Sequence, residues 1–322
     1  MGPADEMDEA RLRAQELCEQ RQAARASRDF QRADELRDEV RELGYIITDT
    51  ADGPVLSLAP PFTMHERALA DGSALGAGAR VLIPLLLEGW RDDADQCVKA
   101  LLQHEQPDSH IVLVDIGDVD GIGLWAQSVA DAHADRVSVV HLPASAAHWA
   151  RIHTDLIERC ASDYYCVLDP SSIVSGPAVG ALCDVLSSEP EVLLAGWRGA
   201  DVDTGDQWRS VTAADGEVDV VLSYLLVMRT ETARAIPPHP KASFYRNADI
   251  EWCLALRERG LADTGVPAKI RALGDALPVD QARHHGYHDS EPTMRDRESR
   301  KTYDRILQRF RGRTDILRPR GI

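Results

Sequence analysis

Carboxylate side chains follow two short β-rich runs of this sequence, at places where strands of a parallel sheet would end. Asp115 closes one run, with Asp118 shortly after it, and Asp169 closes a later run, with Ser171 beyond. Carboxylates at strand ends can bind a divalent cation or hold a polar ligand. An aspartate at such a position is also a good cap for the following helix, so each one alone admits a purely structural interpretation.

A second acidic pair, Asp249 and Glu251, precedes apolar residues whose spacing predicts a helix. Acidic side chains stabilise a helix N-terminus, but a carboxylate there can also take a proton as a general base. Further along, the sequence H-H-G-Y-H-D from His284 to Asp289 gathers three of the eleven histidines in a predicted loop. Such a loop either supplies an imidazole ligand to a metal or packs over a site.

The elements that must position these residues are four β-rich runs separated by helix-length segments. This order predicts a parallel sheet built from βαβ units, with ligands gathering at the carboxyl ends of its strands. We therefore expect an α/β domain over about residues 80–290. The runs are Val81–Pro84, His110–Asp115, Arg136–Leu142 and Tyr164–Asp169.

Composition narrows the class of protein. A chain of 322 residues that is 44% hydrophobic has room for one large α/β domain and a smaller appendage. The net charge of −17 and the pI near 5.0 oppose general attraction to nucleic-acid phosphates. The six cysteines form no C-x-x-C pair, which argues against a zinc cage or a disulfide framework.

We expect a cytoplasmic protein. The apolar run from Val81 to Leu87 is far shorter than the roughly 20 residues needed to cross a bilayer. The N-terminal residues are acidic and show no cationic region followed by an apolar one, so they do not predict a secretory signal.

The first 59 residues predict a separate small module. Residues 8–27 and a segment that starts near Asp29 have helical spacing, and Gly44 ends the second helix. Two β-rich runs then flank an Asp-Gly turn at Asp52 and Gly53, which predicts a β-hairpin. The prolines and glycines of residues 60–79 predict a linker.

This module resembles the C-terminal helical domain of bacterial cysteinyl-tRNA synthetases, through R-Q-A-A-R-A-S-R-D-F-Q-R-A-D-E-L-R-D-E-V-R-E-L-G-Y-I-I-T-D-T-A-D-G. In those enzymes the domain helps to bind tRNA, so the resemblance implies an RNA role. The H-I-G-H and K-M-S-K-S signatures of the synthetases are absent from this sequence, which excludes such a synthetase. For the hairpin in this chain we nevertheless favour scaffolding or docking of a protein partner, with RNA contact as the alternative.

Residues 80–313 resemble a family 2 glycosyltransferase, through V-L-I-P, I-V-L-V-D-I-G-D, Y-Y-C-V-L-D-P-S-S and A-D-I-E-W-C-L-A-L-R-E-R-G. The resemblance implies a Rossmann-like GT-A fold, a nucleoside diphosphate sugar donor and Mg²⁺ or Mn²⁺. It implies that Asp115 grips the nucleoside and that Asp169 holds the diphosphate through the metal. Asp249 would be the catalytic base, and Glu251 would orient a hydroxyl acceptor. The predicted donor-binding residues are Pro84, Asp115, Asp118, Arg151 and Asp169.

Two positions depart from the family pattern. Ser171 stands where a second metal-binding carboxylate is expected, and a serine hydroxyl is a poor substitute for a charged ligand. A histidine from the C-terminal loop is the predicted helper, His285 first and His288 second. The loop before Arg151 also lacks the glycine usual in the family, so Arg151 either contacts the diphosphate or makes a surface salt bridge.

The last segment, residues 291–322, predicts a basic amphipathic helix and tail with Tyr303, Ile306, Leu307 and Phe310 on one side. Its cations could meet an anionic membrane surface, which would make the protein peripheral at the inner face of the membrane, or an anionic partner such as RNA. Alternatively, the apolar stripe docks on the main domain and the arginines face solvent.

The leading hypothesis from the sequence is inverting transfer of a sugar to a hydroxyl acceptor. The alternatives are a noncatalytic GT-A-like protein that binds a nucleotide sugar, an RNA-associated factor that uses the hairpin and the basic tail, and a nucleotidyltransferase on a similar sheet. The fold cannot choose the donor or the acceptor.

Overall fold

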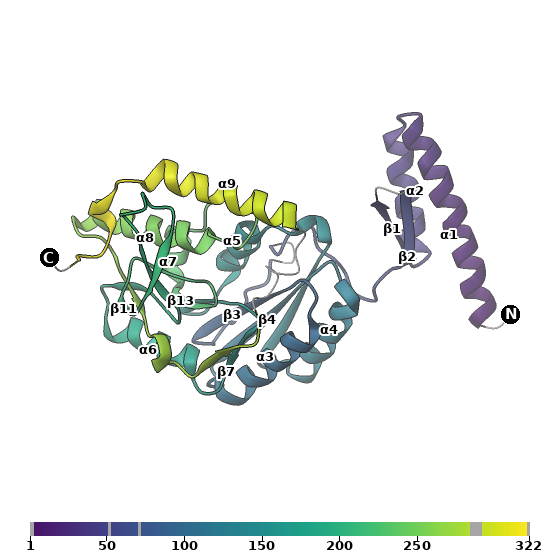
Figure 1. Cartoon of the computed structure of the whole chain (residues 1–322). Helices are drawn as coiled ribbons and strands as arrows, with labels where there is room; N and C mark the ends of the chain where they lie inside the picture. Colours follow the sequence, from purple (N-terminus) through teal and green to yellow (C-terminus); the bar gives the residue numbers. More distant parts are fainter. Residues whose placement is uncertain (1–2, 51–52, 70–71, 284–291, 321–322) are drawn as a thin grey trace. The chain divides into compact units, whose positions relative to one another are not determined.

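The computed structural model describes residues 3–50, 53–69, 72–283 and 292–320. The chain divides into two compact units, Met1–Thr63 and Met64–Ile322 (Figure 1). Each unit has its own apolar core. Each is therefore described by itself.

The first unit is a helical hairpin followed by a β-hairpin, as the sequence predicts. Helix α1 (Pro3–Ala26) packs on α2 (Phe30–Glu42), and strand β1 (Tyr45–Thr50) pairs antiparallel with β2 (Gly53–Leu58). Asp29 caps α2, because its side chain accepts a hydrogen bond of 3.1 Å from the backbone N–H of Arg32.

Apolar packing and one ion-pair cluster hold this first unit together. The buried side chains are Ala14, Leu17, Cys18, Ala24, Ala33, Leu36, Val40, Tyr45 and Ile47. Arg21 donates to both carboxylate oxygens of Asp49 at 2.8 and 2.9 Å, and Arg25 also contacts that carboxylate. Hydrogen bonds from Arg21 and Arg25 hold the pKa of Asp49 well below its usual range. Strand β1 is thus fixed to α1.

The second unit is built on an eight-stranded sheet with the order β11-β14-β8-β13-β6-β3-β4-β5. Within this sheet β13 and β11 run antiparallel to their neighbours, and the other pairs are parallel. The four predicted runs form β3, β4, β5 and β6, which confirms the α/β prediction. The strands are β3 (Val81–Leu87), β4 (Ser109–Ile116), β5 (Val137–Leu142), β6 (Tyr164–Leu168), β8 (Val192–Gly196), β11 (Gly216–Glu217), β13 (Leu225–Arg229) and β14 (Lys269–Ala272).

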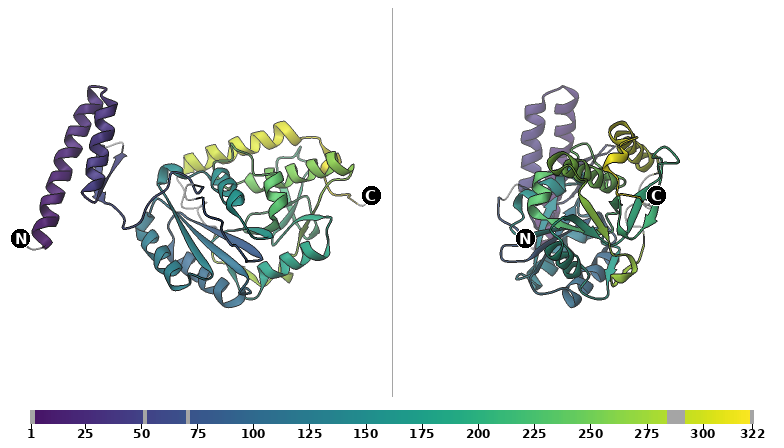
Figure 2. Two further views of the ribbon diagram at one scale, coloured as in Figure 1. Left: turned by 180° about the vertical axis from the view of Figure 1, so that it is seen from behind. Right: turned by 90° about the vertical axis from the view of Figure 1, so that its left-hand side faces the viewer.

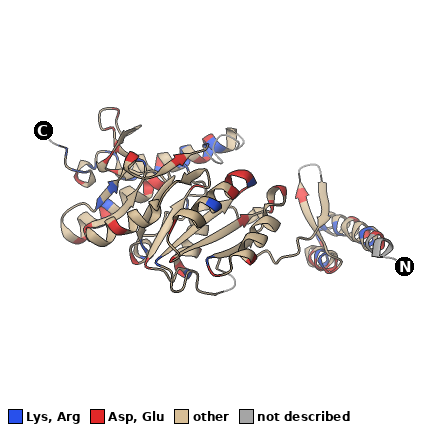
Figure 3. Cartoon of the chain, turned by 90° about the horizontal axis from the view of Figure 1, so that it is seen from below, with Lys and Arg blue, Asp and Glu red and all other residues tan. Residues whose placement is uncertain are grey.

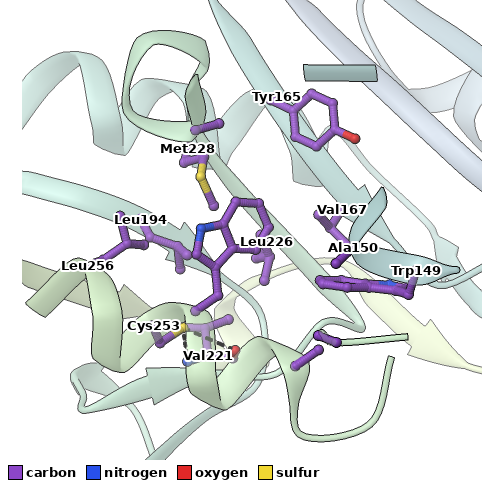
Figure 4. Close-up of a cluster of buried hydrophobic side chains, with 14 of the residues drawn as sticks. Trp149, Ala150, Tyr165, Val167, Leu194, Val221, Leu226, Met228, Cys253 and Leu256 are labelled. Atoms are coloured by element: carbon purple, nitrogen blue, oxygen red, sulfur yellow. Dashed lines mark hydrogen bonds between the residues drawn. The ribbon is translucent and has the colours of Figure 1, made fainter. Parts of the chain in front are cut away.

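Helices cover both faces of this sheet (Figure 2). Alternate residues of β3 explain why, since Ile83 packs in one apolar cluster and Leu82 in the other. The Ile83 cluster contains residues of α3 (Arg91–His104), α4 (Ile122–Ala132) and α6 (Ala178–Ser188). The Leu82 cluster contains residues of α5 (Trp149–Arg159), α7 (Thr230–Ala235), α8 (Ala248–Thr264) and α9 (Pro292–Phe310). Figure 4 shows part of the second cluster around Trp149 and Tyr165.

Two small sheets complete the second unit. Strand β9 (Gly199–Val202) pairs with β10 (Val211–Ala214) and with β12 (Val220–Val221). Strand β7 (Ser172–Val174) pairs antiparallel with β15 (Val279–Gln281). The second pairing holds the chain after residue 279 beside the residues that follow Asp169.

The later part of the predicted linker is anchored on α5. Arg67 donates to the buried carboxylate of Asp155, with Nε 3.1 Å from Oδ2. Arg159, 7% exposed, donates to the carbonyl oxygens of Ala68 and Ser73 and to the Ser73 hydroxyl. The described residues 64–69 and 72–79 are therefore called the strap, since they are anchored on α5 within the second unit.

Helix α9 docks its apolar stripe on the main domain. Ile306 and Phe310 are fully enclosed in the core, and Tyr303 and Leu307 pack against it half-buried. The Tyr303 hydroxyl also donates to the carbonyl oxygen of Trp208 at 2.7 Å. The stripe considered for a membrane surface is therefore covered by protein.

The basic residues of the C-terminal segment are mostly neutralised by ion pairs, so the segment is no free basic patch. Eight of the ten Arg and Lys residues between Arg295 and Arg320 lie within ion-pair distance of a carboxylate. Figure 3 shows Lys and Arg mixed with Asp and Glu in this part of the chain. Arg318, for example, is bonded to Asp201 through Nε at 2.9 Å.

Two expectations about the whole chain can be compared with the structure. All six cysteines are free and buried. Within the described residues, no helix combines the length and the apolar character needed to cross a membrane.

The strap generates a stability prediction. Arg159→Met should lower the free energy of unfolding by about 2–3 kcal/mol, because it leaves buried carbonyl groups of the strap without their charged donor. Denaturant unfolding followed by circular dichroism measures this change. Arg259→Met is the matched control, since Arg259 pairs only with exposed Asp263 on the same helix and should cost under about 0.5 kcal/mol. Equal losses for both variants would contradict the anchoring role of Arg159.

Candidate functional site

The loops after β3 and β4 have strained backbone at the carboxyl edge of the sheet. Trp90, Asp118 and Asp120 have φ values of 52°, 49° and 54°, in the left-handed region that bulky residues avoid. Asp118 is held there by its own contacts, because its N–H donates to Asp115 and its Oδ1 accepts from the N–H of Gly123. Strain of this kind is concentrated at binding sites and catalytic sites.

Asp169 follows β6 directly and is half-buried. Its Oδ1 accepts hydrogen bonds from the N–H of Ser171 at 2.8 Å and from the Ser171 hydroxyl at 2.7 Å. Ser171 is fully buried, and its hydroxyl also contacts the carbonyl oxygen of Arg283. The serine that replaces the expected second carboxylate therefore turns inward and supports the geometry of Asp169.

Strand β13 brings a second carboxylate to Asp169. Because β13 is antiparallel to β6, its first residue, Leu225, is paired with Leu168 at the carboxyl end of β6. The residues just before β13 are thereby placed beside Asp169, whose N–H donates to the carbonyl oxygen of Tyr224 at 3.1 Å. The N–H of Ser223 donates to Oδ2 of Asp249 at 2.8 Å. The dipeptide Ser223-Tyr224 thus connects the two aspartates.

Asp249 lies in the first turn of α8 and is 7% exposed. Its Oδ1 accepts a hydrogen bond of 2.8 Å from the N–H of Ile250. Burial raises the pKa of Asp249 above its usual range, against the lowering effect of the Ser223 and Ile250 hydrogen bonds. A carboxylate with a raised pKa is a stronger base than an exposed aspartate.

The nearby carboxylates affect the pKa values of two tyrosines. Burial raises the pKa of Tyr224, and the negative charges of Asp169 and Asp249 raise it further, while a hydrogen bond with Gln281 lowers it. Burial also raises the pKa of Tyr245, again with a contribution from Asp169. Tyr224 is therefore close enough to both carboxylates for their charges to affect its pKa.

A pocket opens beside Asp169. Leu86 of β3, Glu88 just after that strand, and Trp149 and His153 of α5 line it. The remaining lining residues include Asp169, Ser223 and Tyr245. The sequence analysis did not identify Glu88, His153, Ser223, Tyr224 or Tyr245. The apolar run Leu225–Arg229 was the available signal for the strand that positions Ser223 and Tyr224.

Asp115 is completely buried, and both of its oxygens have partners. Oδ1 accepts from the N–H of Asp118 at 3.0 Å, and Oδ2 lies 2.9 Å from Nδ1 of His141, its register neighbour on β5. The other ring nitrogen of His141 lies 3.2 Å from Oε1 of Gln127. In this arrangement Asp115 shapes the edge of the sheet through its neighbours.

The other predicted residues lie at different distances from the pocket. Pro84 is buried inside β3, which continues to Leu87, so the strand does not end where the sequence analysis placed it. Arg151 is exposed and donates to the carbonyl oxygen of Ala146 at 3.2 Å. Glu251 is buried against α9, where Arg305 donates to both of its oxygens at 3.0 and 2.8 Å. The structure brings Asp169 and Asp249 together and directs Glu251 to Arg305.

The described residues do not form a divalent-cation site by themselves. They contain no group of three or more His, Cys, Asp or Glu placed to hold a metal, and the Ser171 hydroxyl is used inside the fold. The predicted ligands His285 and His288 lie outside the described residues. Arg283, the last described residue before them, contacts Ser171 through its carbonyl oxygen and Asp93 through its guanidinium at 3.1 Å.

Comparison with known proteins separates the two units. Residues 7–53 match the family of cysteinyl-tRNA ligase anticodon binding domains. A stretch of 41 residues is 49% identical to the cysteine–tRNA ligase of Finegoldia magna and covers 13% of this chain and 9% of the ligase. The chain therefore spans a small part of that relative, and the predicted resemblance of the N-terminal module is confirmed.

Most of the chain is similar in fold to solved GT-A glycosyltransferases. GalNAc-T7, solved with UDP, GalNAc and Mn²⁺, has a TM-score of 0.54 at 11% identity over 71% of this chain and 48% of that chain. The mannosyltransferase PcManGT from Pyrobaculum calidifontis, solved with GDP-Man and Mn²⁺, has a TM-score of 0.49 at 12% identity over 71% and 62%. At 11% identity the likeness to GalNAc-T7 shows the fold alone, and the predicted GT-A fold is confirmed.

The position of Ser171 predicts a response to metal. Ser171→Asp should lower the free energy of unfolding by about 1–3 kcal/mol without a divalent cation, because a second carboxylate would then face Asp169 and the Arg283 carbonyl. Adding Mn²⁺ should restore stability by neutralising the pair. Thermal unfolding with and without Mn²⁺ measures this. Ser171→Asn, which adds no charge, is the control, and equal Mn²⁺ effects on both variants would contradict the geometry.

Proposed function

We propose that the second unit is a glycosyltransferase that moves a sugar from a nucleoside diphosphate to a hydroxyl group with inversion. The observation that carries this proposal is the joining of Asp169 and Asp249 by Ser223-Tyr224, at the carboxyl edge of a GT-A sheet. The similarity to GalNAc-T7, whose structure holds UDP, supports a nucleotide donor.

Asp249 is the proposed catalytic base. An inverting transfer needs a carboxylate that accepts the proton of the acceptor hydroxyl while its oxygen attacks the anomeric carbon from the face opposite the leaving group. Backbone N–H groups of Ser223 and Ile250 fix the carboxylate, and burial makes it more basic than an ordinary aspartate. Glu251 contributes by joining the helix that carries Asp249 to Arg305.

The donor occupies the pocket beside Asp169 in this proposal. Asp169 accepts hydrogen bonds from sugar hydroxyls, and Arg151 is the exposed cation assigned to the diphosphate. Asp115 and Asp118 hold the strained loop after β4 in place, and this loop forms the side of the site that contacts the nucleoside. A divalent cation at this edge would be held by Asp169, although the described residues contain no group of three or more His, Cys, Asp or Glu placed to hold one.

A noncatalytic nucleotide-sugar-binding protein is the second candidate. One specific observation favours it, namely that the Ser171 hydroxyl is fully buried and bonded within the fold, where a metal-binding carboxylate is expected. Such a protein would bind the donor without turning it over, so a turnover measurement separates it from the first candidate.

We further propose that the first unit binds RNA and that the acceptor hydroxyl belongs to a tRNA. The match of residues 7–53 to an anticodon binding domain, and the 49% identity over 41 residues, support this assignment. Arg11, Arg28 and Arg37 are exposed on the two helices and are available to contact phosphates.

The role of Asp249 predicts the kinetics of a single variant. Asp249→Asn should lower turnover of UDP-sugar and GDP-sugar donors by about 10²–10⁴-fold, because the amide cannot take a proton. Donor affinity, measured by calorimetry, should change much less, because the amide keeps the same shape and can still accept one of the two backbone hydrogen bonds. The assay is release of nucleoside diphosphate, with tRNA and without it. Asp263→Asn on the same helix, at an exposed carboxylate, is the control.

The pH dependence of turnover gives a second reading of the same variant. The base acts only when deprotonated, and burial raises its pKa, so the acidic limb of the rate profile should lie above the usual aspartate value of 3.8. That limb should be absent from the residual activity of Asp249→Asn. Loss of donor affinity with turnover retained would contradict the assignment of Asp249.

The proposed acceptor predicts a division of labour between the units. A chain that starts at Met64 should lose tRNA binding by about tenfold or more and keep its affinity for the nucleotide donor, because the two units have separate cores. Filter binding with total tRNA measures the first property, and calorimetry measures the second. Ribosomal RNA fragments are the control ligand. Unchanged tRNA binding by the shortened chain would contradict an RNA role of the first unit.

A further inference from the structure

His153 is a buried titratable residue on the wall of the pocket beside Asp169, and the proposed mechanism leaves it without a role. It lies on α5 and is 1% exposed. Its Nδ1 is 2.7 Å from the hydroxyl oxygen of Tyr165, which is completely buried. The ring of Trp149 lies against it with centroids 4.5 Å apart. The ring is therefore held firmly in one orientation.

The second ring nitrogen of His153 is the one that faces the pocket. Within the described residues Nδ1 is engaged by Tyr165, and Nε2 makes no hydrogen bond. His153 lines the pocket together with Asp169 and Ser223, so the ring edge away from Tyr165 is the one available to a ligand there.

The proton of the imidazole is on Nε2. Burial lowers the pKa of His153 to about 3, so the ring is neutral and carries one N–H. Burial also keeps the Tyr165 hydroxyl protonated by raising its pKa well above the usual value. Within the described residues that hydroxyl has Nδ1 as its acceptor, and leaving its proton unbonded would be costly. Tyr165 therefore donates to Nδ1, and Nε2–H points at the pocket as a donor.

The walls of the pocket suit a sugar ring. Trp149 and Tyr245 line the pocket with aromatic rings, which can contact the C–H groups of a pyranose, and the Asp169 carboxylate can accept from its hydroxyls. A neutral N–H donor complements them, because it bonds a hydroxyl oxygen without adding charge. A charged group would instead favour the diphosphate.

We propose that His153 recognises the transferred sugar, by donating a hydrogen bond from Nε2–H to one of its hydroxyl oxygens between Trp149 and Tyr245. This inference rests on the proposed glycosyltransferase function and assigns it a residue that selects the sugar. A sugar that lacks this hydroxyl leaves the buried Nε2–H donor unpaired, so the contact discriminates between sugars that differ at a single position.

Two substitutions distinguish the roles of the two ring nitrogens of His153. The amide oxygen of asparagine reaches the place of Nδ1 and can accept from Tyr165, and the amide nitrogen of glutamine reaches the place of Nε2. His153→Asn therefore removes the pocket donor, and His153→Gln keeps it. Tyr165→Phe is the control that removes only the core hydrogen bond. The full-length variants are titrated by calorimetry with GDP, GDP-mannose, UDP, UDP-glucose and UDP-GalNAc, and their thermal stability is recorded.

The expected result is a loss of affinity for the nucleotide sugar without a loss of affinity for the nucleotide. His153→Asn should bind the preferred nucleotide sugar about tenfold more weakly and the matching nucleotide unchanged, while His153→Gln and Tyr165→Phe should bind both within about threefold of wild type. Deoxy analogues of that donor, titrated into wild type, give an independent measure. One of them should lose about tenfold in affinity, even where a variant does not fold.

Four results would overturn the inference. In the first, His153→Asn loses nucleotide and nucleotide sugar equally, together with thermal stability, as a residue of the core would. In the second, no deoxy analogue loses affinity in wild type. In the third, wild type binds neither nucleotides nor nucleotide sugars, which contradicts the proposed function as well. Binding by wild type that is the same for every sugar contradicts only the role of His153.

Discussion

The reversed strand β13 is the constraint on which the site depends. It lies between β8 and β6 in an otherwise largely parallel sheet, so its first residue meets the last residue of β6 at the ligand-binding edge. The preceding dipeptide then makes two backbone hydrogen bonds, to the N–H of Asp169 and to the carboxylate of Asp249. A parallel strand at that place would carry Ser223 and Tyr224 to the opposite edge.

Much of this architecture could be predicted from local sequence. Apolar runs such as Val81–Leu87 identify the central strands, and Asp29 and Gly44 mark the ends of α2. The direction of β13 was not predictable, because it follows from pairing with strands far away in the sequence. His153 was missed because one histidine in an amphipathic helix gives no signal until Tyr165 and the pocket lie beside it. The basic C-terminal segment looked free because its acidic partners, such as Asp201 and Glu258, are distant in the sequence.

If the acceptor is RNA, the negative charge of the chain opposes its binding. A chain with a net charge of −17 repels phosphates at long range, so RNA must be held by local contacts on the first unit. The cations of α9 cannot help, since most are paired with carboxylates that shape the domain. A tRNA bound through the first unit would raise the local concentration of its hydroxyls at the second.

The central claim is that the carboxyl edge of the sheet, at Asp169 and Asp249, binds a nucleoside diphosphate sugar. Calorimetric titration of the full-length protein with UDP and with GDP, each with and without Mn²⁺, tests it most directly because no acceptor is needed. We predict saturable one-site binding of one nucleotide with a Kd of about 1 μM to 1 mM. No binding of either nucleotide, with or without Mn²⁺, would contradict the claim.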